Sequence, residues 1–104
     1  MTIQSKNWTA QLDRMPGAGP TFRVYGTVTV AHPGITPKLV PSQVQDTPFL
    51  PLELVLEDNN GINVQVLTDK FVEYKVTGDY HASNVGIFYN GQLLQYIDEV
   101  LITQ

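Results

Sequence analysis

Asp79, His81 and His32 are the residues whose types and spacing come closest to a catalytic or metal-binding pattern. Asp79 and His81 stand two positions apart, so in an extended segment the carboxylate and the imidazole point to the same side. A zinc or general-base site would require His32 to converge with them in the fold. A small hydrolase or metal-binding enzyme that uses His81, Asp79 and His32 is therefore one interpretation. The sequence does not favour it, because no serine lies in a Gly-x-Ser-x-Gly elbow and there is no cysteine nucleophile.

Two turn-like stretches could hold an ion instead. Residues 14–22, RMPGAGPTF, lack the lysine that follows the glycines of a phosphate-binding loop, and a strand pattern rather than a helix comes next. Residues 57–61, EDNNG, lack the alternating acids of a calcium-binding EF-hand loop. Both stretches are interpreted as turns, and no catalytic residue, metal ligand or cofactor is predicted.

The length and the net charge of the chain limit the kinds of molecule that it is expected to bind. The chain has 104 residues, enough for one domain over 1–104 with its own core. Ten acids against six scattered bases give a net charge of −4, which disfavours binding to nucleic acid. No apolar run approaches the roughly 18 residues of a membrane span, and the start lacks the apolar core of a signal peptide. No membrane insertion is expected, and the location is predicted to be cytoplasmic if Met1 is the native start.

Alternation of apolar and polar residues dominates the chain and indicates half-buried strands. It is clearest over residues 21–31, TFRVYGTVTVA, where every second residue from Phe22 to Val30 is apolar or glycine. The residues between them are threonines, Arg23 and Tyr25, so this strand is expected to bury one face only.

Five further segments are expected to be strands. They are residues 8–12, 35–41, 50–57, 62–66 and 71–76. Asn60-Gly61 predicts a hairpin between 50–57 and 62–66, because both positions of such a turn need a positive φ. The prolines of 35–41 limit that segment to the edge of a sheet.

The C-terminal part fits two alternatives. Asn90-Gly91 between alternating segments predicts a hairpin. The apolar spacing over residues 92–103 also fits an amphipathic helix. Because β-branched and aromatic residues are frequent here, the hairpin is favoured, and a helix at 92–103 stays an alternative.

The number of short strands and turns predicts an all-β fold. We expect a single antiparallel β-sandwich of the immunoglobulin-like type, with about seven strands. A small β-barrel, or a β-sandwich with a C-terminal helix at 92–103, are the alternatives.

A tryptophan near the start is followed by MPGAGP, VYGTVTV and HPGIT. This order of motifs resembles small uncharacterised bacterial all-β proteins over residues 8–76. The resemblance implies an all-β fold and carries no activity or site residue.

The C-terminal hairpin also predicts an apolar surface. If Val85 lies opposite Tyr96 and Ile87 opposite Leu94, a set of apolar residues shares the other face. These residues are Phe88, Leu93, Ile97 and Leu101. A two-layer sandwich cannot bury both faces of one sheet, so either the proline-rich segment covers this face or it contacts another molecule.

We therefore predict a binding or structural module rather than an enzyme. It engages a protein partner or itself through this apolar face or through a sheet edge. An alternative is a carbohydrate or peptide bound on the exposed face of 21–30, at Arg23 and Tyr25.

Overall fold

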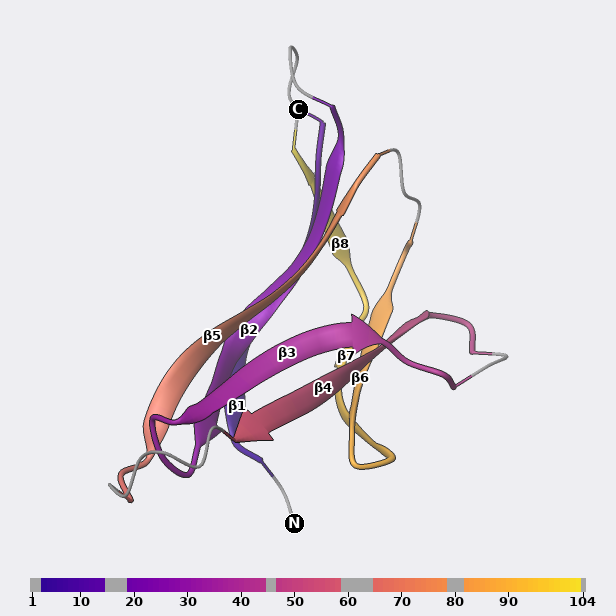
Figure 1. Ribbon diagram of the computed structural model, residues 1–104. Coiled ribbons are helices and arrows are strands. Elements are labelled where there is room, and N and C mark those ends of the chain that lie inside the picture. Colours follow the sequence, from indigo (N-terminus) through magenta and orange to yellow (C-terminus); the bar gives the residue numbers. More distant parts are fainter. Residues whose placement is uncertain (1–2, 15–18, 45–46, 59–64, 79–81, 104) are drawn as a thin grey trace.

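The chain folds into two packed β-sheets (Figure 1). The computed structural model describes residues 3–14, 19–44, 47–58, 65–78 and 82–103. The strands within these residues are β1 (Ser5–Asp13), β2 (Thr21–Val30), β3 (Ile35–Pro41), β4 (Leu50–Asp58), β5 (Thr68–Thr77), β6 (Val85–Tyr89), β7 (Gln92–Ile97) and β8 (Val100–Thr103). The all-β sandwich predicted from the sequence is confirmed.

Each sheet has four strands. Sheet A has the order β5-β2-β1-β8 and sheet B the order β3-β4-β6-β7. The two sheets are separate, so the barrel alternative is wrong, and residues 92–97 and 100–103 are strands rather than a helix. The pairs β1–β8 and β4–β6 are parallel, so the sandwich is mixed rather than purely antiparallel. Parallel neighbours cannot be joined by a tight turn, and for that reason local turn signals did not predict them.

The alternation of β2 sets the position of the core. Its apolar positions are buried and its polar positions half-buried along the whole strand, as predicted. The largest fully buried side chains come from both sheets. They are Phe22, Leu52, Ile87, Val24, Val28, Val30 and Val85. The described residues contain no helix long and apolar enough to cross a membrane.

Trp8 lies over Gly26 inside the sandwich. The pairing of β1 with β2 shifts between Lys6 and Thr9, where Asn7 has a φ of 60°. A Cβ atom on Gly26 would lie 2.4 Å from Cε3 of Trp8. The missing side chain of Gly26 therefore makes the room that the indole ring occupies.

The hairpin predicted after β4, through Asn60-Gly61, falls mostly on residues outside the described part of the chain. β4 pairs with β3 and β6 in sheet B, whereas β5 pairs with β2 in sheet A. Residues 65–67 lie outside the strands, and Asn60 and Gly61 lie outside the described residues. The connection from β4 to β5 is thus a crossover between the sheets, which a turn signal cannot distinguish from a hairpin.

The hairpin at Asn90-Gly91 is confirmed. Their φ values of 52° and 79° are those of a type I′ turn. Next to the turn, Phe88 pairs with Leu93, but the register shifts between Ile87 and Phe88. Beyond this bulge the predicted pairing is wrong.

Val85 pairs with Ile97 instead of Tyr96, and Ile87 pairs with Gln95 instead of Leu94. One extra residue on one strand is enough to change which face a later side chain occupies.

Candidate functional site

The structure divides the predicted apolar face of the C-terminal hairpin. Phe88 and Leu93 are paired on the outer face of sheet B, with Leu93 about half exposed. Ile97 points into the core and is only 9% exposed, because the β6–β7 bulge reverses its side. Leu101 belongs to β8 of sheet A, where it lies beside Gln11. The expectation that these four residues share one face is therefore wrong.

Phe49 covers part of the outer face of sheet B. Its ring lies 6.0 Å from that of Phe88 and 5.5 Å from that of Tyr96, measured between centroids. A Cβ atom on Gly86 would lie 2.2 Å from Phe49, so this glycine makes room for the ring. The segment before β4 thus covers β6, and this face is a weaker docking candidate than the sequence indicated.

The four edge strands of the sandwich differ in how well they are protected from further pairing. β3 contains Pro37 and Pro41, which cannot donate to a sheet ladder. β5 carries four charged side chains along its length, a common device against edge pairing. β7 and β8 contain neither a proline nor a charged residue.

We call β7 and β8 together the open edge. They lie on the side of the sandwich away from β3 and β5, and only Asp98 and Glu99 separate them in the sequence. Large apolar side chains remain exposed here. They are Leu93, Tyr96, Leu101 and Ile102. Leu101 and Ile102 are consecutive and therefore extend to opposite faces of β8.

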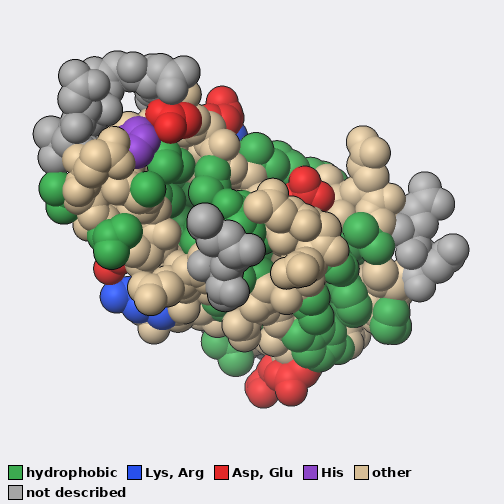
Figure 2. Space-filling model, turned by 90° about the horizontal axis from the view of Figure 1, so that it is seen from below, with side chains coloured by type: hydrophobic (Ala, Val, Ile, Leu, Met, Phe, Trp, Pro, Cys, Tyr) green, Lys and Arg blue, Asp and Glu red, His purple; other side chains and the backbone are tan. Residues whose placement is uncertain are grey.

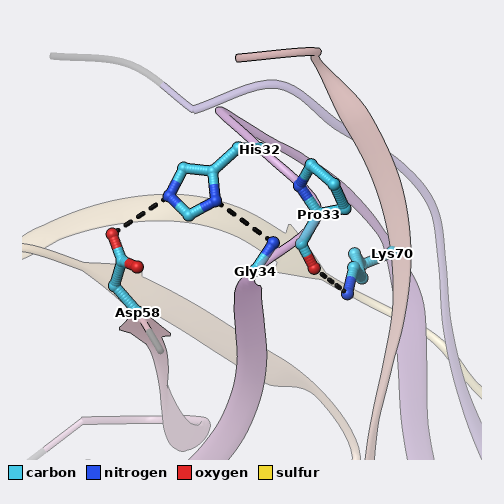
Figure 3. Close-up of polar contacts among 5 residues, drawn as sticks. All are labelled: His32, Pro33, Gly34, Asp58 and Lys70. Carbon is cyan, nitrogen blue, oxygen red and sulfur yellow. Dashed lines mark hydrogen bonds and ion pairs between the residues drawn. The ribbon is translucent and has the colours of Figure 1, made fainter. Parts of the chain in front are cut away.

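His32 is a buried residue held by the chain itself (Figure 3). Its Nδ1 accepts a hydrogen bond from the Gly34 amide at 3.1 Å, which places the imidazole proton of the neutral ring on Nε2. Nε2 lies 3.1 Å from Oδ2 of Asp58 and donates to it. On the other side of the turn, Lys70 donates to the carbonyl of Pro33 at 2.7 Å.

This arrangement uses both ring nitrogens of His32 to hold the β2–β3 turn. Asp79 and His81, the other members of the predicted enzyme set, lie outside the described residues. Among the residues that are described, no group of three or more His, Cys, Asp or Glu side chains could hold a metal ion. Asp58 is the partner that sequence reasoning missed, since it lies 26 positions from His32.

Arg23 and Tyr25 lie side by side on the outer face of sheet A, as predicted. The guanidinium of Arg23 stands 5.7 Å from the ring centroid of Tyr25 and donates to Gln11 at 2.9 Å. It also lies 3.8 Å from a carboxylate oxygen of Glu73. The ring of Phe71, which sequence reasoning did not single out, lies 5.9 Å from that of Tyr25.

Asp69 lies near the start of β5, on the same outer face of sheet A. It accepts hydrogen bonds from the Thr29 hydroxyl at 2.7 Å and from the Lys6 ammonium at 3.1 Å. The Thr29 hydrogen bond, followed by the bond and charge of Lys6, lowers the pKa of Asp69 below its ordinary value of 3.8. The Asp69 carboxylate therefore contributes to the stability of the fold at pH values above its pKa in the unfolded chain. This contribution to stability is lost as the pH falls through the lower pKa of the folded state.

An apolar pocket opens at one end of the sandwich, between the two sheets. It has a volume of about 440 Å³. Its apolar lining consists of Ile3, Val30, Ala31, Ile35, Leu56, Leu67 and Tyr89. From below the molecule, hydrophobic side chains are visible near the histidine (Figure 2).

No protein-family model, curated protein or solved structure matches this chain. The resemblance to small bacterial β-proteins stays a prediction.

Proposed function

We propose that this domain is a self-pairing β-module in which β8 pairs with β8 of a second copy. The observation that carries the proposal is the unequal protection of the edges. Prolines and charges guard β3 and β5, whereas β8 exposes apolar side chains on an edge that has no such guard. Uncharged edge strands readily accept another strand.

The sequence of β8 is compatible with a twofold antiparallel pairing. A twofold axis normal to the sheet keeps each face on its own side, so residues with the same orientation must lie opposite each other. With the axis at Leu101, the two copies of Leu101 meet on the outer face. Val100 then faces Ile102 of the second copy. This register joins apolar side chains on both faces without opposing like charges.

In such a dimer, sheet A of one copy and sheet A of the second copy would form one continuous sheet. Because β8 is only four residues long, the new ladder is short and the contact small. Small interfaces of this kind are typical of weak complexes, so we expect a dissociation constant of ~10 μM.

Leu101→Lys is expected to weaken the pairing of β8 with β8. The substitution places two ammonium groups opposite each other at the twofold axis and removes the central apolar contact. We expect the dissociation constant to rise at least about tenfold, equivalent to about 1.4 kcal/mol. Sedimentation equilibrium over a concentration series measures this change.

Leu67→Lys is the matched control, because Leu67 is 74% exposed and lies outside the strands. It introduces the same charge into the chain and should pair like the unmodified protein. Thermal melts of both variants confirm that the fold is retained. A Leu101→Lys chain that pairs as tightly as the control would overturn the proposal.

A further inference from the structure

The outer face of sheet A carries two aromatic rings, of which Phe71 is exposed and Tyr25 is half-buried. Tyr25 of β2 and Phe71 of β5 are diagonal neighbours whose ring planes are inclined by 36°. Phe71 is 62% exposed although it lies within a strand. A cross-strand aromatic pair explains the contact between the rings, but it does not require one ring to stay mostly in water.

Polar side chains stand on both sides of this pair in the ladder of β1, β2 and β5. On one side, Arg23 is held by Gln11 and Glu73. On the other side, Asp69 is held by Lys6 and Thr29. Cross-strand register places Tyr25 and Phe71 between these two groups. The face therefore offers donors and acceptors in prearranged positions beside the exposed ring of Phe71 and the half-buried ring of Tyr25.

This face is the solvent side of its sheet. Alternate residues of β2, from Phe22 to Val30, point inward and are buried, so the positions between them face outward. β5 has the same arrangement, with Val72 buried and Phe71 and Glu73 exposed. A ligand could approach the rings without any change in the fold.

The side chains on the outer face of sheet A are suited to one class of ligand. Exposed aromatic rings stack on flat, weakly polar surfaces, and the neighbouring groups can both donate and accept hydrogen bonds. The charges are mixed: Asp69 is paired with Lys6 and Glu73 with Arg23, so these positive charges are already opposed and attract a phosphate or sulfate less strongly. A neutral sugar ring meets these conditions, since it has an apolar face and hydroxyl groups around its rim.

We propose that the outer face of sheet A binds a neutral saccharide, stacked on Phe71 and Tyr25 and hydrogen-bonded by the Arg23 and Asp69 groups. The two rings stand on β2 and β5, and β8 forms the opposite edge of sheet A. The site does not depend on self-pairing, and the two proposals can fail separately.

Isothermal titration with cellohexaose, xylohexaose and maltohexaose tests the proposal, with a heparin hexasaccharide as the anionic comparison. At least one neutral hexasaccharide should bind with a dissociation constant of ~1 mM or lower. Phe71→Ala should weaken that binding about tenfold or more, whereas Phe71→Tyr, which keeps the ring, should stay within about threefold. Leu101→Lys should bind the sugar like the unmodified chain.

Several results would overturn the proposal. These are no binding of any neutral hexasaccharide at 10 mM (~10 times the expected constant), binding of the heparin hexasaccharide alone, and unchanged binding by Phe71→Ala. A fourth is loss of self-association in Phe71→Ala without any sugar binding by the unmodified chain, which would make this face a protein contact.

Discussion

Leu52→Asp is expected to prevent folding. Leu52 is fully buried in β4, between Pro41 of β3 and Ile87 of β6. Removing a buried leucine typically costs about 2–5 kcal/mol, and an unpaired buried carboxylate adds several more. Domains of this size have a total stability of about 5–15 kcal/mol. Far-UV circular dichroism should show no cooperative thermal transition.

Val55→Asp is the control on the same strand. Val55 lies on the opposite face of β4 from Leu52 and is paired with Lys38, whose charge favours the new carboxylate. This variant should fold, with a melting temperature within a few degrees of the unmodified protein. Equal melting curves for Leu52→Asp and Val55→Asp would show that the register of β4 is wrong.

Gly26→Ala is expected to displace the indole of Trp8. The added methyl group would lie 2.4 Å from the ring, much closer than carbon atoms approach each other. Overpacking of this kind typically costs about 1–3 kcal/mol, which lowers the melting temperature of a domain of this size by roughly 4–8 °C for each kcal/mol. Trp8 is the only tryptophan in the chain, so its fluorescence emission reports the displacement directly and should shift to longer wavelength.

Gly19→Ala is the control for this substitution, since no atom lies within 4 Å of a Cβ placed there. Its melting temperature and emission should match those of the unmodified chain. If Gly26→Ala also leaves both unchanged, Trp8 does not pack on Gly26.

Local patterns in the sequence predicted the elements well, because alternation and turn chemistry act over a few residues. The faces of β2, the edge position of β3 and the turn at Asn90-Gly91 follow from such patterns. The pairing of β1 with β8 and of β4 with β6 joins segments far apart in the sequence, and no local signal specifies it.

In the candidate sites, too, sequence patterns predicted residues of a single strand but not contacts between distant strands. Arg23 and Tyr25 were predicted from one strand, but Phe71 joins them only because β5 pairs with β2. An aromatic residue at an outward position of a strand was the signal that could have identified it. The hairpin face was predicted incorrectly because a one-residue bulge turns Ile97 inward and because β8 leaves sheet B for sheet A.

The solution mass of the unmodified chain shows whether β8 pairs with β8 of a second copy. Sedimentation equilibrium from ~1 to ~500 μM brackets the expected dissociation constant. The weight-average mass should rise from the 11.6 kDa of one chain toward twice that value. A mass of 11.6 kDa at every concentration would contradict this pairing.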